Sequence, residues 1–145
     1  MLVQQILKSK GGDGQIISVK PGDDVAAAAE LLSSHRIGTV VVSEDGQSLN
    51  GILSERDIVR EIGRRGSECL QESVSALMTS EIVTCQPSDT ADAILEMMTK
   101  GRFRHVPVMQ DGKMIGLISI GDVVKARLSE LSMEKDALQD MIMGH

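Results

Sequence analysis

The chain contains the same pattern twice, once in residues 17–58 and again in residues 82–123. When Pro21 is aligned with Pro87, 66 positions later, the apolar positions of the two segments coincide, with one extra residue in the first copy. Neither segment is long enough to bury an apolar face alone. We therefore predict one pseudo-symmetric domain in which the two copies complete each other's core.

Each copy repeats one order of predicted elements: a helical turn, a strand, a helix, two strands and a second helix. β-Branched runs bounded by turn residues predict the paired strands, at 39–43 and 50–54 and again at 105–109 and 114–119. This order predicts an α/β fold with small sheets covered by helices. The predicted segments are repeat 1 (1–62), a connector (63–73), repeat 2 (74–128) and a C-terminal helical extension (129–145).

The start of each copy has apolar residues at helical spacing, namely Val3, Ile6 and Leu7 in the first copy and Val74, Leu77 and Met78 in the second. We expect each of these opening turns to dock on its own repeat. Residues 11–14 predict a loop. A short strand is expected at 16–19, followed by a helix capped by Asp23 or Asp24, and in the second copy by Asp89.

Composition excludes several classes of function. The net charge of −6 argues against nucleic acid as the main partner. No apolar run approaches the roughly 20 residues that cross a bilayer, and no leader sequence is recognisable, so we expect a cytoplasmic protein without a membrane partner. Cys69, Cys85 and the three histidines lack metal-ligand spacing. With no P-loop and no nucleophile beside a base, we expect neither a metal site nor enzyme activity.

Two Ser-x-x-Asp motifs, Ser54 to Asp57 and Ser119 to Asp122, each follow a predicted strand and open a predicted helix. One interpretation is a capping box. The other is ligand binding, because a helix N-terminus and a serine hydroxyl suit a phosphate, whereas the aspartate would repel phosphate and suits the vicinal hydroxyls of a ribose. Recurrence at matching places favours binding, and phosphate donors beside a ribose acceptor describe a nucleotide site.

Further candidates flank the paired strands. Arg104 and His105 precede an apolar strand and would neutralise phosphate, although alternation sends them to opposite faces and a solvated charge run is the alternative. Gly38 and Thr39 occupy the same place in the first copy, so the two sites are not equivalent. Arg56 adds positive charge to the first motif.

Adenine recognition is expected from backbone groups just before the two prolines, on edge strands that the prolines end. Aliphatic side chains would clamp the ring, or else belong to the core: Val40, Ile52, Val106, Pro107 and Ile118. No catalytic role is predicted for Cys85. The candidate ligand-binding residues are Ser18, Lys20, Gly38, Thr39, Val40, Ser54, Arg56, Asp57, Val83, Thr84, Arg104, His105, Val106, Pro107, Ile118, Ser119 and Asp122.

The segments 51–57, 104–108 and 116–122 resemble a tandem pair of CBS domains, named after cystathionine β-synthase, over the range from Val3 to about Leu128. The resemblance implies a Bateman module whose clefts between repeats bind AMP, ATP, NAD(H) or S-adenosylmethionine as regulatory ligands, with no catalytic cofactor. It implies ribose contacts for the two motif aspartates, phosphate contacts for the two motif serines, and charge neutralisation by Arg104 and His105. It also implies a disc-like homodimer.

Two functions are consistent with these patterns. The first is an adenosine-nucleotide sensor that regulates a separate, unidentified protein through a ligand-dependent population shift. The second is a structural dimerisation module with vestigial ligand clefts. The final helix, from about Asp122 towards Met143, bears on this choice through a partial apolar seam, Val124, Leu128, Leu131, Leu138 and Met141. This seam either packs on its own domain or forms a self-association surface, which its length favours.

Overall fold

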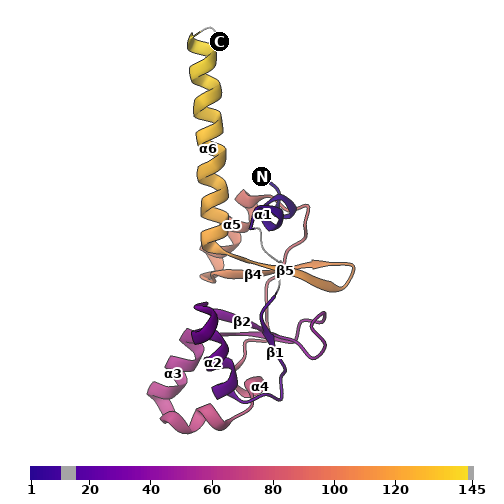
Figure 1. The fold of residues 1–145 in the computed structure, drawn as a ribbon, viewed down its shortest axis with the longest axis vertical. Helices are drawn as coiled ribbons and strands as arrows, with labels where there is room; N and C mark the ends of the chain where they lie inside the picture. The colour runs from indigo at the N-terminus through magenta and orange to yellow at the C-terminus, as the bar shows by residue number, and fades with distance from the viewer. Residues whose placement is uncertain (11–15, 144–145) are drawn as a thin grey trace. The chain divides into compact units, whose positions relative to one another are not determined.

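The computed structural model describes residues 1–10 and 16–143, so the loop predicted at 11–14 lies outside the described residues (Figure 1). The observed order of elements confirms the predicted α/β fold. The elements are α1 (Val3–Ser9), β1 (Ser18–Val19), α2 (Val25–His35), β2 (Thr39–Val42), β3 (Gly51–Ser54), α3 (Glu55–Arg65), the 3₁₀ helix η1 (Ser67–Gln71), α4 (Val74–Leu77), α5 (Ala91–Gly101), β4 (His105–Gln110), β5 (Lys113–Ser119) and α6 (Ile120–Met143).

These elements form two compact units that do not follow the order of the chain. The described residues of one unit, here called the repeat-1 unit, are 16–83 and 109–115. Those of the other, the repeat-2 unit, are 1–10, 84–108 and 116–143. Helix α1 therefore belongs to the repeat-2 unit and α4 to the repeat-1 unit. The prediction that each opening turn docks on its own repeat was wrong, because the two turns are exchanged.

Matching backbone hydrogen bonds fix the exchanged turns. The N–H of Val3 donates to the carbonyl of Asp89 at 2.8 Å, and the N–H of Val74 donates to the carbonyl of Asp23 at 2.7 Å. Apolar periodicity predicts that a helix has a buried face, but it carries no information about which core receives that face. The exchange was therefore not predictable from spacing alone.

The repeat-1 unit contains a three-stranded sheet in the order β1-β2-β3. Strand β1 is parallel to β2, and β2 is antiparallel to β3 with Thr39 opposite Ser54. All four residues of β2 are buried, as expected for a central strand that carries a run of valines. Helices α2 and α3 lie on one side of this sheet in Figure 1. This arrangement places the end of β3, and hence Ser54, beside the start of β2.

The helix caps agree with the prediction in one copy only. Asp24 caps α2 by accepting a hydrogen bond from the N–H of Ala27 at 2.9 Å. In the second copy the N-cap of α5 is Thr90, so the prediction of Asp89 was wrong. The carboxylate of Asp89 instead accepts from the N–H of Gln86 at 2.7 Å, within the turn that precedes the helix. A threonine at the next position supplies the hydroxyl that the cap needs.

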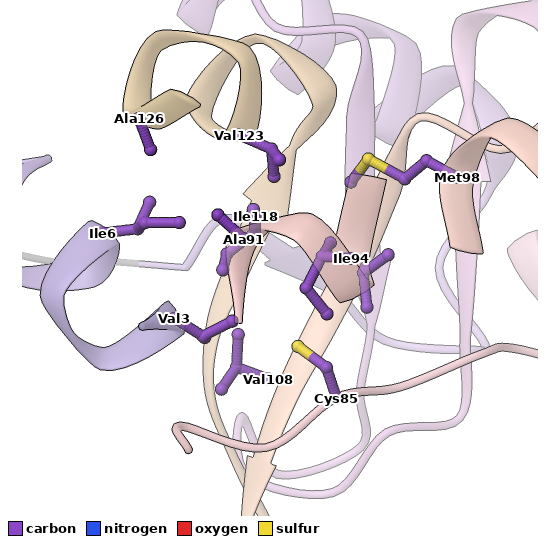
Figure 2. Close-up of a cluster of buried hydrophobic side chains, with 11 residues drawn as sticks. Val3, Ile6, Cys85, Ala91, Ile94, Met98, Val108, Ile118, Val123 and Ala126 are labelled. Carbon is purple, nitrogen blue, oxygen red and sulfur yellow. The ribbon is translucent and has the colours of Figure 1, made fainter. Parts of the chain in front are cut away.

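The core of the repeat-2 unit is shared by α1, α5, α6 and strands β4 and β5 (Figure 2). Its buried residues are Val3, Ile6, Cys85, Ala91, Ile94, Met98, Val106, Val108, Ile118, Val123 and Ala126. Burial, with a smaller contribution from the nearby charge of Asp89, raises the pKa of the Cys85 thiol to about 12. This thiol therefore stays protonated at neutral pH and acts as a small apolar group.

The segment predicted as a connector, 63–73, is mostly helical. Helix α3 continues to Arg65, and the 3₁₀ helix η1 follows Gly66, whose φ is +85°. Arg65 pairs with Glu61 at 2.7 Å and with Glu72 at 2.6 Å. The guanidinium group thus ties the end of α3 to the residue that follows η1.

Helix α6 has 24 residues and extends beyond the core of its unit. Only Val123 and Ala126 of this helix are buried. The side chains of the predicted seam are exposed: Val124, Leu128, Leu131, Leu138 and Met141. The alternative that the helix packs on its own domain thus holds for its first turns, through Val123 and Ala126, but not for the seam.

Candidate functional site

The Ser-x-x-Asp motif of the repeat-2 unit lies where β5 ends and α6 begins. The N–H of Ser119 donates to Oδ2 of Asp122 at 2.9 Å, and the N–H of Asp122 donates to Oγ of Ser119 at 3.2 Å. These reciprocal bonds confirm the capping interpretation. They do not bury the acid, because 23% of the Asp122 side chain remains exposed. The motif is thus a rigid helix start with a carboxylate at its surface.

A cation that the sequence analysis missed contacts this carboxylate. The Nζ atom of Lys10 lies 3.0 Å from Oδ2 of Asp122 and donates to the carbonyl of Leu117 at 2.8 Å. Lys10 directly follows α1, one of the exchanged turns. No local pattern connects it with a motif more than a hundred residues away, and only knowledge of the exchange would have placed it here.

The charges around Asp122 favour its ionised form. Burial works against ionisation, but the N–H of Ser119 and the ammonium group of Lys10 outweigh it, so the pKa of Asp122 lies below its ordinary value. Burial lowers the pKa of the neighbouring His105 imidazole; the Asp122 carboxylate opposes this shift, and Lys10 and Arg104 add to it. At neutral pH the site therefore presents a carboxylate beside a neutral imidazole.

The other candidates of this unit divide into surface and core. The carbonyl of Arg104 accepts from the N–H of Ile120 at 2.8 Å, which brings Arg104 beside the motif. Arg104 is exposed and His105 is half-buried. Val106 and Ile118 are buried in the core, which supports their alternative assignment, and Pro107 is buried beside Val106 in β4. Thr84 is exposed and directly precedes the bridge between Cys85 and Val108.

The matching motif of the repeat-1 unit is held more tightly. Oδ2 of Asp57 accepts from both the N–H and the hydroxyl of Ser54, each at 3.0 Å. Oδ1 accepts from the guanidinium group of Arg60 at 2.7 Å. The side chain of Asp57 is 13% exposed, whereas that of Arg60 is 67% exposed. A ligand that approaches Asp57 must therefore displace Arg60 or share the carboxylate with it.

The first-copy candidates around β2 also meet this motif. The N–H of Glu55 donates to the carbonyl of Gly38 at 2.9 Å, and Thr39 lies opposite Ser54 in the sheet. Val40 is fully buried and belongs to the core, while Arg56 is exposed on the first turn of α3. The structure thus places Gly38 and Thr39 beside Ser54 and the start of α3.

The predicted edge-strand residues lie elsewhere in this unit. Strand β1 is at one edge of the sheet, and Ser18 and Lys20 line a pocket of about 430 Å³ together with Glu44 and Asp45. The motif residues do not line this pocket. Val83 is 44% exposed. Ser18 and Lys20 are therefore not brought together with Ser54 and Asp57 within the repeat-1 unit.

Comparison with known proteins agrees with this geometry. The family model of the CBS domain matches residues 13–64 and 74–129. The chain belongs to the CBS domain family. The mitochondrial CBS domain-containing protein CBSX3 of Arabidopsis thaliana is 36% identical over 148 residues, which cover 98% of this chain and 72% of that protein. The tandem CBS resemblance predicted from the motifs is confirmed.

Solved CBS structures share the fold. A CBS-domain containing protein from Agrobacterium tumefaciens is 46% identical, with a TM-score of 0.81 over 88% of this chain and 99% of that chain. The crystal structure of CBSX2 in complex with AMP is 27% identical, with a TM-score of 0.73 over 88% of this chain and 96% of that chain. AMP is thus bound by one structurally similar CBS pair.

A metal-binding group and a membrane-spanning helix are both absent from the described residues of this CBS pair. Within residues 1–10 and 16–143, no three His, Cys, Asp or Glu side chains are grouped to hold a metal ion. No helix in the same ranges has the length and apolar character that a bilayer crossing requires.

Proposed function

We propose that this CBS pair is a regulatory module that binds an adenosine nucleotide of the AMP, ATP or NAD(H) type and acts on a separate protein. The observation that carries the proposal is the Asp122 carboxylate, which is ionised, partly exposed and next to His105 and Arg104. Both described contacts of this carboxylate use Oδ2. The other oxygen is therefore not needed to hold the side chain in place and suits a sugar hydroxyl. The AMP complex of the similar CBSX2 supports the choice of ligand.

Binding of AMP, ATP and NADH, measured by titration calorimetry, tests the proposal. Asp122→Ala should weaken binding about tenfold or more, because hydrogen bonds to a charged acceptor contribute about 1.5–3 kcal/mol each. Asp136→Ala is the matched control, since Asp136 is an exposed residue of the same helix. Thermal unfolding checks that both variants fold. Equal affinity of the wild type and Asp122→Ala would remove Asp122 from the site.

We propose that Asp57 binds the ribose of a second nucleotide, and that this nucleotide binds more weakly than the one at Asp122. Arg60 already contacts Oδ1 of Asp57, and Gly38 and Thr39 replace the basic pair of the second copy. Asp57→Ala should therefore leave the stronger binding event unchanged and remove only a weaker one. Loss of the stronger event in Asp57→Ala would reverse this assignment.

The ligand can regulate a partner only if it binds one conformation of the protein more tightly than another. Only such a difference in affinity changes the fraction of molecules in each conformation. The regulated protein is a partner of unidentified sequence. We propose a cytoplasmic location, which cell fractionation tests. The mitochondrial location named for the similar CBSX3 is the competing outcome.

A structural dimerisation module is the second candidate, and the exposed apolar residues of α6 favour it. In this function the seam contacts α6 of a second copy of the chain, because it runs along a helix that extends beyond its own core. Failure of AMP, ATP and NADH to bind at millimolar concentration would support this function over the sensor. Nucleotide binding that leaves the association state unchanged would support the sensor.

A further inference from the structure

The repeat-2 unit has a pocket of about 300 Å³ between α1 and α6. Its polar lining comes from Ser9 and Lys10 at the end of α1 and from Asp122, Lys125 and Ser129 on α6. The three α6 residues are spaced three and four positions apart, so they share one face of the helix. The same carboxylate that is proposed to hold a ribose thus also forms part of a second, lysine-lined cavity.

The charges in this pocket suit an anion. Lys10 balances Asp122, to which it is bonded, and Lys125 adds a further positive charge. The nearby Glu130 does not line the pocket, and its carboxylate is paired with the N-terminal ammonium group of Met1, which does line it, and with Arg127 at 3.1 Å. The pocket therefore presents more positive than negative charge.

The hydrogen-bond donors of the pocket also suit an anion. A lysine ammonium group has three N–H donors. Lys10 uses two of them, on the carbonyl of Leu117 and on Asp122, and its side chain remains 39% exposed. The third donor of Lys10, the ammonium group of Lys125 and the hydroxyl of Ser129 belong to residues that line the same pocket, and donors of this kind suit the oxygens of a phosphate group. Phosphate groups are bound in this way by lysines acting as point charges.

We propose that this pocket binds a phosphate group of the nucleotide other than the 5′ α-phosphate, so that the repeat-2 site prefers nucleotides with more than one phosphate to AMP. The inference rests on the proposed function, because Asp122 links the pocket to the ribose. A phosphate at either of two positions on the nucleotide would present the same chemical group to the pocket. One is the tail of a 5′-polyphosphate. The other is a phosphate on one ribose hydroxyl, which in dinucleotide sites is accommodated by a nearby cation, leaving the second hydroxyl for Asp122.

The repeat-1 unit lacks a counterpart of Lys10. The opening turns correspond at Leu7 and Met78, whose side chains lie against Gly116 and Gly51 respectively. Beyond this point the paths differ, because the N–H of Thr79 donates to the carbonyl of Ile52 at 2.9 Å. A residue three positions after Met78 is Glu81, which is acidic. The preference for additional phosphate is thus expected at the repeat-2 site alone.

Titration calorimetry with AMP, ATP and adenosine 3′,5′-bisphosphate tests the inference. The wild type should bind ATP or the bisphosphate about tenfold more tightly than AMP, as expected for one or two charge-assisted hydrogen bonds, and the favoured compound identifies the position of the phosphate. Lys125→Met should reduce the affinity for that compound about tenfold more than the affinity for AMP. Lys8→Met is the control, because Lys8 is exposed on α1 and does not line the pocket.

The outcomes separate this inference from the proposed function. Equal affinity of the wild type for all three nucleotides, or a preference that survives Lys125→Met, would overturn the phosphate pocket and leave the nucleotide sensor standing. Failure of all three nucleotides to bind would contradict the sensor itself. An arm without nucleotide tests the pocket directly: inorganic triphosphate should shift the amide NMR signals of Ser9, Lys125 and Ser129 in the wild type. Unchanged signals would also overturn the inference.

Discussion

The two motif aspartates have the same capping partners but different cations. Asp122 contacts Lys10, which comes from the far end of the chain, whereas Asp57 contacts Arg60 on its own helix. Arg60 is mostly exposed, and exposed ion pairs contribute little to stability. The different cations should therefore affect ligand binding more than the stability of the fold, because they give the two carboxylates different charge surroundings.

At the same site His105 should make stability depend on pH. Burial lowers its pKa in the folded protein, so as the pH falls below the ordinary histidine value of about 6.5 the unfolded state binds a proton that the folded state resists. The free energy of unfolding, measured with urea, should therefore decrease between pH 7.5 and 5.5. His105→Gln should flatten this decrease.

His35 provides the control for that measurement, because its side chain is exposed at the end of α2. His35→Gln should keep the pH dependence of the wild type. A slope that persists in His105→Gln would assign the effect to another group.

Among the elements, those defined by local chemistry were predicted and those defined by distant partners were not. The valine run of β2 and the glycine turns gave the strands, and Ser54 gave the start of α3. Which unit receives α1 depends on packing against residues such as Ile94, which no local pattern encodes. Thr90 and Asp89 are both competent caps, and backbone geometry decided between them.

The candidate site shows the same limit. The motif residues Ser119 and Asp122 follow from their position at a strand end, and their reciprocal bonds are those of a capping box. Lys10 was missed because it reaches the site only through the exchanged turn. Val106 and Ile118 were assigned two alternative roles, since an apolar residue on a strand fits a ligand wall and a core equally well in sequence.

The exchange predicts which unit responds when α1 is weakened. Ile6 is 2% exposed in the core of the repeat-2 unit, so Ile6→Ala should cost about 2–5 kcal/mol by leaving a cavity there. In native-state hydrogen exchange, the amides of α5 should lose more protection than those of α2. Ile58→Ala, in the core of the repeat-1 unit, is the matched control and should show the reverse pattern. Equal losses in α2 and α5 for both variants would contradict the assignment of α1.

Within its described residues, 120–143, helix α6 has no buried side chain beyond Ala126. Leu128, Leu131, Leu138 and Ile142 follow the three- and four-residue spacing of a coiled coil, with Lys135 as the one interruption. All four apolar side chains are at least 48% exposed. A single polar residue at such a position lowers stability but fixes register, which suits pairing with one defined partner.

Self-association through α6 should therefore depend on these four apolar side chains, three of which belong to the seam predicted from the sequence. The double substitution Leu131→Glu and Leu138→Glu places charges where apolar contact is expected and should convert a dimer into a monomer in sedimentation experiments. Met133→Glu replaces an exposed apolar residue on the opposite face of the same helix and is the control. A dimer that survives the double substitution would show that another surface holds the copies together.

The exchanged opening turns also affect how this chain is made. Residues 1–10 are synthesised before their hydrogen-bonding partner Asp89 and before the buried face of α5. Val3 and Ile6 therefore lack their core until α5 and α6 have been synthesised, so folding of the repeat-2 unit waits for these later helices. A fragment that starts at residue 74 would lack these two side chains, and supplying the first ten residues as a separate peptide should restore its missing surface.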